Sequence, residues 1–138
     1  MKLDAELVLE LHVDIGEVQV VGKTSNGFLR IIPITGGHFT GPYISGTVIP
    51  GGADWNTEIK DGLSHVYAKY AIKTDDGVVI SVENEGYIDW SRADSVIKTV
   101  PRFQVQDSEK YAWLQSGVFV ASLDPQNGFV EIKVYKMK

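Results

Sequence analysis

The sequence contains no cysteine. This absence excludes disulfides, a thiolate nucleophile and cysteine metal ligands, and it fits a reducing compartment. Long apolar runs are also missing, since no stretch approaches the roughly 20 residues that a membrane-spanning helix needs. The first residues, MKLDAELVLELHV, place Asp4, Glu6 and Glu10 among apolar side chains, unlike the uninterrupted apolar core of a signal peptide. We therefore expect a cytoplasmic protein that does not enter a membrane.

Positive charge is scarce, because 13 Lys and Arg stand against 18 Asp and Glu, for a net charge of −5. Binding to phosphates needs clustered basic residues, and these are scattered, so nucleic acid is not an expected partner. His12, His38 and His65 lie far apart and form no ligand-spacing motif, so no metal site is expected. The pairs Gly36-Gly37 and Gly51-Gly52 match neither a phosphate-binding loop nor a dinucleotide fingerprint, and we expect no cofactor.

The apolar pattern is that of strands, with no helical period longer than a turn or two. Leu7, Leu9, Leu11, Val13 and Ile15 share one parity, which is typical of a half-buried strand. Further strand-like runs cover residues 28–34, 43–49, 64–85, 96–106, 113–122 and 129–135. About eight to ten antiparallel strands in one domain, residues 1–138, indicate a barrel or a sandwich. We favour the barrel, because closure removes sheet edges and about eight strands leave room for one small ligand.

The clearest hairpin spans residues 64–85 around the turn Thr74-Asp75-Asp76-Gly77, with Gly77 as a left-handed bulge. The expected pairs are Ile72 with Ile80, Tyr70 with Val82, and Ala68 with Asn84. The apolar face must point inward, so the Tyr70 hydroxyl and the Asn84 amide enter the interior, where each needs a partner. That partner is either an internal hydrogen-bond network or a ligand.

The stretch from Gly36 to Trp55 holds six of the 14 glycines and two of the five prolines. Glycine lets main chain approach a neighbour or ligand closely, so we interpret this stretch as one wall of a pocket, with Phe39 as a candidate ligand contact. The Gly51-Gly52 turn then delivers Asp54 and Trp55. Asp54 is a candidate general base whose pKa is raised beside the indole. Alternatively, Asp54 caps the turn and Trp55 plugs the core.

Arg102 lies between Pro101 and Phe103, and its guanidinium suits a carboxylate. A regular strand points Arg102 outward as a solvated or salt-bridged residue, and only a bulge at Pro101 turns it inward. Tyr111 and Trp113 form an aromatic stripe that is either ordinary core or a pocket lining.

The residues between and after this stripe are also apolar, namely Ala112, Leu114, Val118 and Val120. A strand that is apolar on both faces suggests a subunit interface, so we expect a homo-oligomer, a dimer.

Several motifs together resemble one family. They are Gly51-Gly52-Ala53-Asp54-Trp55, Thr74-Asp75-Asp76-Gly77, Pro101-Arg102-Phe103 and Tyr111-Ala112-Trp113-Leu114, with Gly37, Phe39, Tyr70, Asn84 and Gly86. Their order and spacing over nearly the whole chain resemble domain-of-unknown-function family 3237, although His38, Gln115 and Ser116 depart from its pattern. The resemblance implies a calycin-like, lipocalin-like antiparallel β-barrel and no settled activity.

These observations predict a barrel whose interior binds a small, partly apolar organic molecule. The polar contacts are Asp54, Tyr70, Asn84 and Arg102, and the walls are Trp55, Tyr111, Trp113 and Phe39. If the barrel is catalytic, we expect cofactor-free proton transfer, with Asp54 moving the proton and Arg102 or Tyr70 stabilising negative charge. The alternatives are a non-catalytic binding module and a protein-interaction barrel with a filled interior.

Overall fold

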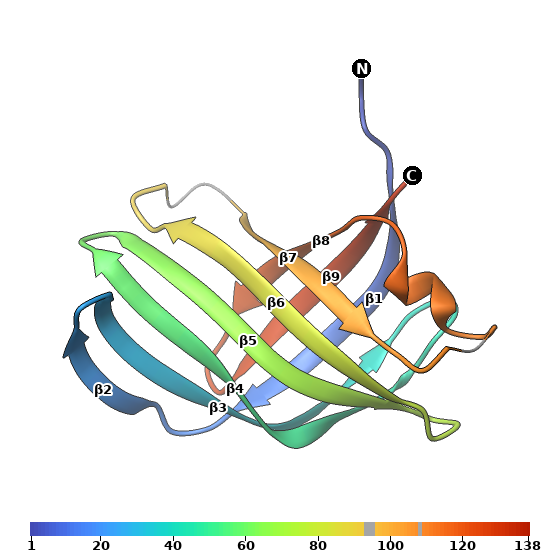
Figure 1. Ribbon diagram of the computed structural model, residues 1–138, viewed down its shortest axis with the longest axis horizontal. Helices are drawn as coiled ribbons and strands as arrows, with labels where there is room; N and C mark the ends of the chain where they lie inside the picture. The colour runs from blue at the N-terminus through green and yellow to red at the C-terminus, as the bar shows by residue number, and fades with distance from the viewer. Residues whose placement is uncertain (93–95, 108) are drawn as a thin grey trace.

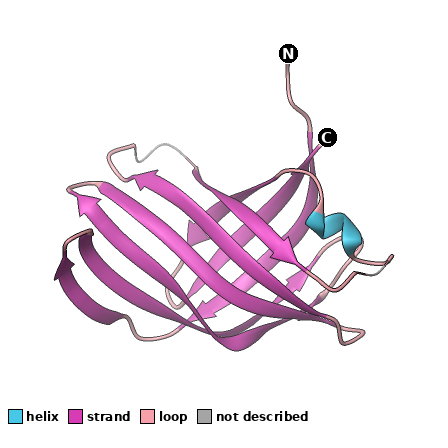
Figure 2. Ribbon diagram, in the orientation of Figure 1, coloured by secondary structure: helices cyan, strands magenta, loops and turns pink. Residues whose placement is uncertain are grey.

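In a computed structural model, which describes residues 1–92, 96–107 and 109–138, the chain forms strands and one short 3-10 helix (Figures 1 and 2). The elements are β1 (Ala5–Ile15), β2 (Gln19–Thr24), β3 (Gly27–Thr40), β4 (Gly46–Lys60), β5 (Leu63–Thr74), β6 (Val79–Asp89), β7 (Ile97–Gln104), η1 (Ala112–Gln115), β8 (Phe119–Pro125) and β9 (Phe129–Met137). The expected all-β class is confirmed.

The strands form one antiparallel sheet in the order β1-β9-β8-β7-β6-β5-β4-β3-β2, and β1 also pairs with β3. This last pairing closes an eight-stranded barrel, which confirms the barrel over the sandwich. The first half of β3 pairs with β2 and its second half with β1, so β2 continues the line of β1 along the same edge. In Figure 1, β2 lies at the end of the barrel where the β4–β5 turn and the end of β6 also lie.

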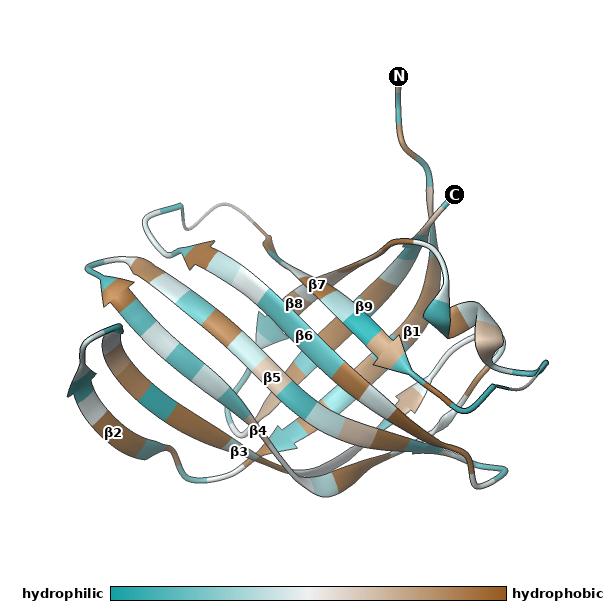
Figure 3. Ribbon diagram, viewed as in Figure 1, coloured by the Kyte–Doolittle hydropathy of each residue, from teal (hydrophilic) through white to brown (hydrophobic). Residues whose placement is uncertain are grey.

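The β5–β6 hairpin has the expected register, with Ile72 opposite Ile80, Tyr70 opposite Val82, and Ala68 opposite Asn84. Gly77 has a φ of +92°, and its N–H donates to the Thr74 carbonyl at 2.9 Å. Figure 3 shows the resulting alternation of hydrophobic and hydrophilic residues along these strands. Tyr70 and Asn84 are buried, as the parity of the hairpin predicts.

The two glycine pairs do not end strands, contrary to the sequence-based expectation. Gly36-Gly37 lies inside β3 and Gly51-Gly52 inside β4, each where the pairing register shifts. A Cβ on Gly37 would lie 2.0 Å from the His12 carbonyl oxygen, and a Cβ on Gly52 would lie 2.4 Å from the Tyr70 Cβ. These glycines therefore permit close approach of neighbouring strands at bulges.

One end of the barrel is filled by large apolar side chains. Phe39, Ile72, Ile80 and Leu114 are each 2% exposed or less. Leu114 belongs to η1, so residues 112–115 form a helical turn where a strand was expected. Within the described ranges, no helix is long and apolar enough to cross a membrane.

Candidate functional site

The barrel interior contains a cavity of ≈ 80 Å³ toward the end bounded by the β4–β5 and β8–β9 turns. Its lining comprises Val13, Ile15, Ile32, Ile34, Asp54, Val66, Ala68, Tyr70, Asn84, Thr99, Leu123, Val130 and Ile132. Ile15, Ile32, Leu123 and Val130 are half-buried, whereas Tyr70, Asn84 and Thr99 are buried. The cavity therefore has an apolar, partly exposed rim and polar groups deeper inside.

The Asp54 side chain reaches the cavity from β4. It follows directly after the point between Ile49 and Ala53 at which the register of β4 against β5 shifts. Its Oδ1 accepts a hydrogen bond from the Tyr67 backbone N–H at 3.1 Å. Burial raises the pKa of Asp54, and this effect outweighs the Tyr67 hydrogen bond and the nearby His65, which both lower it. The carboxyl group is thus half-buried and more basic than an exposed aspartate.

Asp54, Ala68 and Asn84 lie in one row across three strands, because Asp54 pairs with Ala68 and Ala68 pairs with Asn84. Neighbouring strands are about 4.8 Å apart, so the outer two Cα atoms of the row lie about 10 Å from each other. Only the Ala68 methyl group stands between them on the inner face. This small side chain leaves room between a carboxyl group and an amide.

Asn84 is 5% exposed, and its Oδ1 has no hydrogen-bond partner in the described part of the chain. An inward Asn84 was expected to pair either with an internal hydrogen-bond network or with a ligand. No such network satisfies the Asn84 Oδ1 among the described residues. Tyr70 is 6% exposed, and burial raises the pKa of its hydroxyl group far above the usual value. Both candidates from the hairpin therefore lie at the cavity.

Thr99 on β7 is a cavity residue that the sequence reasoning missed. It is 2% exposed, and its Oγ1 likewise lacks a hydrogen-bond partner among the described residues. Thr99 lies three residues before Arg102 and so has the opposite parity. A regular strand that points Arg102 outward therefore points Thr99 inward, so strand parity was the signal that could have found it.

Arg102 and Trp55 face away from the cavity. The β6–β7 register runs without a shift from Ser81 opposite Gln104 to Glu85 opposite Val100, so no bulge turns Arg102 inward. Arg102 is exposed, which corrects its candidacy as a catalytic residue. Trp55 is 41% exposed, because it follows the inward Asp54 on the same strand and must point to the other face. The indole therefore neither lines the cavity nor desolvates Asp54 as expected.

Phe39, Tyr111 and Trp113 are not among the cavity-lining residues. Phe39 is 1% exposed in the packed core, and Trp113 packs against that core beside Tyr43, with ring centroids 5.9 Å apart. Tyr111 and Trp113 are therefore ordinary core residues, which was one of the two alternatives. Phe39, Tyr111 and Trp113 do not contact this cavity, contrary to their assignment as ligand contacts. Of the glycine-rich stretch from Gly36 to Trp55, only Asp54 contributes to this cavity, whereas residues 41–45 and residues 51–53 with Trp55 line two other pockets.

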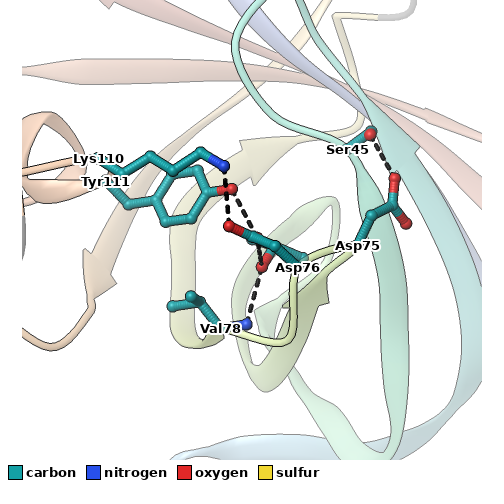
Figure 4. A network of polar contacts seen from close by, with 7 residues as sticks. Ser45, Asp75, Asp76, Val78, Lys110 and Tyr111 are labelled. Atoms are coloured by element: carbon teal, nitrogen blue, oxygen red, sulfur yellow. Dashed lines mark hydrogen bonds and ion pairs between the residues drawn. The ribbon is translucent and has the colours of Figure 1, made fainter.

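A polar network fastens the segment before η1 to the β5–β6 turn (Figure 4). Asp76 accepts hydrogen bonds from Lys110 at 2.8 Å, from the Tyr111 hydroxyl at 2.8 Å and from the Thr74 hydroxyl at 2.6 Å. The Thr74 hydroxyl also accepts the Val78 N–H at 2.8 Å. These bonds fix Tyr111 at the filled end of the barrel, opposite the end at which the cavity lies.

The histidines lie on the outer face, as expected for His12 and His65. His12 stacks on His38 and on Phe129, with ring centroids 4.9 Å and 4.2 Å apart, and bonds Glu131 at 2.7 Å. Among the residues that the structure describes, no group of three or more His, Cys, Asp or Glu side chains is arranged to hold a metal ion.

Comparison with known proteins places the chain among relatives of the same size. The model of the family described as "Protein of unknown function (DUF3237)" matches residues 3–137. A UPF0311 protein of Bradyrhizobium diazoefficiens is 38% identical over an alignment 149 residues long, gaps included, that covers 98% of this chain and 97% of the relative.

Two solved structures extend this similarity. A conserved protein of unknown function from Rhodopseudomonas palustris has a TM-score of 0.88 and 34% identity, covering 100% of this chain and 99% of that one. A structure described as an enzyme from Penicillium herquei has a TM-score of 0.78 and 25% identity, covering 99% and 96%. The barrel is thus shared at full length.

Proposed function

This chain belongs to the DUF3237 family of proteins of unknown function, and on that premise we propose that it binds a small, partly apolar organic molecule at the open end of its barrel. The proposal rests on two buried polar atoms, Asn84 Oδ1 and Thr99 Oγ1, whose residues line a largely apolar cavity. Neither atom has a hydrogen-bond partner among the described residues. An unpaired buried polar group costs about 1–3 kcal/mol, so an arrangement of two such groups needs a compensating partner.

The cavity size limits what is bound. Pockets for drug-sized ligands measure about 300–1,000 Å³, whereas this cavity measures ≈ 80 Å³. A ligand therefore places one small end inside, and its remainder passes the rim of Ile15, Ile32, Leu123 and Val130. These branched apolar side chains favour an apolar body behind a polar tip.

Methyl-resolved NMR tests this proposal with cyclopentanol as the probe, because its five-membered ring is small and apolar. Ile34, Val66 and Ile132 line the cavity, so we expect saturable shifts of their methyl resonances. The methyl resonances of Ile72 and Ile80, in the filled end of the barrel, should not shift. Shifts that are absent up to millimolar probe, or spread evenly over both ends, would contradict binding in the cavity.

A cavity-filling variant supplies the control. Ala68→Leu adds apolar volume between Asp54 and Asn84 and should abolish the shifts. Ala71→Leu makes the same change on the same strand three residues away, outside the cavity lining, and should leave them intact. Equal titration curves for both variants would place the probe elsewhere.

Asp54 favours a second candidate function, cofactor-free acid/base catalysis. Its carboxyl group lines the cavity, its pKa is raised by burial, and Tyr70 lines the same cavity. A base whose pKa is moved toward the working pH combines a usable ionised fraction with greater basicity. One relative of the same fold is described as an enzyme, which supports a catalytic reading.

Cyclopentanone in deuterated water tests the basic step directly. The ionised Asp54 takes a proton from the carbon beside the carbonyl, the electron pair moves to the carbonyl oxygen, and a deuteron then returns to the carbon. We expect exchange faster than in buffer alone, and Asp54→Asn should reduce it to the buffer rate with the fold retained. Equal exchange by both proteins would remove Asp54 from the chemistry.

A further inference from the structure

We propose that Asn84 and Thr99 together receive one hydroxyl group, so that the cavity selects the uncharged, hydroxyl-bearing end of an apolar molecule. This inference rests on the proposed function and names its ligand class. It also adds Thr99 as a specificity-determining residue.

Strand pairing brings the two side chains together. Asn84 lies opposite Pro101 and Glu85 opposite Val100, so the next pair in this antiparallel register is Gly86 opposite Thr99. A Cβ on Gly86 would lie 3.0 Å from the Thr99 Cγ2, which shows how close these two residues are. Asn84 is thus the diagonal neighbour of Thr99, at a Cα separation of about 7–8 Å. Glycine at position 86 makes room for the Thr99 side chain, because a larger residue there would press on the Thr99 methyl group and the Lys98 carbonyl.

The chemistry of the two atoms is complementary to a hydroxyl group. The Asn84 Oδ1 is a carbonyl oxygen that accepts, whereas the Thr99 hydroxyl both donates and accepts. A hydroxyl group of the ligand can donate to Asn84 and accept from Thr99, which satisfies both atoms at once. A ketone oxygen can only accept, so it satisfies Thr99 and leaves the Asn84 oxygen unpaired.

The charges around the cavity exclude anionic ligands. Among the residues that the structure describes, the lining contains no Lys, Arg or His, and its one ionisable group of low ordinary pKa is the Asp54 carboxyl. A carboxylate or phosphate placed there would lose its hydration without gaining a cation and would face Asp54. The neighbouring bases, His65 and Lys69, alternate with the inward residues of β5 and lie on its outer face.

A set of probes with one ring shape separates the alternatives: cyclopentanol, cyclopentanone, cyclopentanecarboxylate and cyclopentylamine, each titrated by methyl-resolved NMR at neutral pH. We expect cyclopentanol to bind about five- to 100-fold more tightly than the ketone, because the cost of an unpaired buried oxygen converts to a factor in that range. The carboxylate should bind more weakly still. Tightest binding by the ketone, the carboxylate or the amine would overturn the hydroxyl assignment while leaving a binding cavity.

Isosteric variants test the two residues themselves. Asn84→Leu keeps the side-chain shape and should reduce the alcohol-to-ketone affinity ratio about tenfold, because the ketone then leaves no oxygen unpaired. Thr99→Val removes the donor that both probes use, so it should weaken the binding of cyclopentanol and cyclopentanone by about the same factor, about tenfold, and keep the ratio. Thr57→Val, on β4 and outside the cavity lining, is the matched control and should keep the wild-type ratio. An unchanged ratio in Asn84→Leu, or unchanged affinity for both probes in Thr99→Val, would refute the role of that residue, whereas absence of binding by all four probes would instead refute the proposed function.

Discussion

The unpaired atoms at the cavity predict a stability change of unusual sign. Most substitutions of buried residues destabilise a protein. Thr99→Val replaces the orphan hydroxyl with a methyl group of the same shape, so the folded state no longer buries an unpaired polar atom. We expect the free energy of unfolding to rise by about 1 kcal/mol for Thr99→Val, and by about 1–2 kcal/mol for Asn84→Leu, which removes a larger polar group.

Thr74 provides the matched comparison, because it is also a buried threonine, at 3% exposure. Its hydroxyl donates to Asp76 at 2.6 Å and accepts from the Val78 N–H at 2.8 Å. Each of these two hydrogen bonds makes a net contribution of about 0.5–1.5 kcal/mol to the free energy of unfolding. Thr74→Val should therefore lower the free energy of unfolding by about 1–3 kcal/mol, opposite in sign to Thr99→Val.

Urea denaturation of the three variants and the wild type, followed by tryptophan fluorescence, measures these differences from the midpoints at unchanged slope. A loss of stability in Thr99→Val as large as that in Thr74→Val would show that the Thr99 hydroxyl is hydrogen-bonded in solution. That result would refute the inference that the fold leaves this group without a partner.

Four further predictions concern charge. Asp54→Asn should stabilise the fold at pH values above the raised folded-state pKa of Asp54, and the gain should shrink as pH falls toward its unfolded value; urea midpoints across pH test this. The hydrogen bond with Glu131 raises the pKa of His12, so the contribution of this pair to stability is complete below the unfolded pKa of 6.5 and lost as pH rises through the folded value. His12→Asn should therefore lower the free energy of unfolding more in mild acid than in mild base. Equal losses at both pH values would contradict the ion pair. Asp76 has a lowered pKa through Lys110 and its hydroxyl donors, so Asp76→Asn should destabilise at neutral pH and lose that effect in strong acid, as acid titration of both proteins will show. Arg102→Ala, on the outer face, should change stability by less than about 0.5 kcal/mol and leave cyclopentanol affinity unaltered; a marked loss of affinity would return Arg102 to the site.

The features that the sequence predicts well are those set by local chemistry. Alternation and the Thr74–Gly77 turn fix the β5–β6 register, because a shift by one residue would turn every apolar side chain outward. The same parity places Tyr70 and Asn84 on the inner face. Closure of the barrel followed from strand number and the cost of free edges.

The features that it misses depend on distance along the barrel. Parity shows which face a residue takes but not the level at which it lies, so Tyr111 and Phe39 were assigned to a pocket although they fill the opposite end. The glycine pairs were read as turns because a bulge inside a long strand has the same local signature. Trp55 was assigned inward together with Asp54, although adjacent strand residues must face opposite sides.

The most direct measurement of the central claim is a crystal structure from crystals soaked in cyclopentanol. The proposed function predicts the ring in the cavity, with its oxygen within hydrogen-bonding distance of the Asn84 Oδ1 and the Thr99 Oγ1. A cavity closed by its own side chains, or occupied by ordered water alone at saturating cyclopentanol, would contradict it.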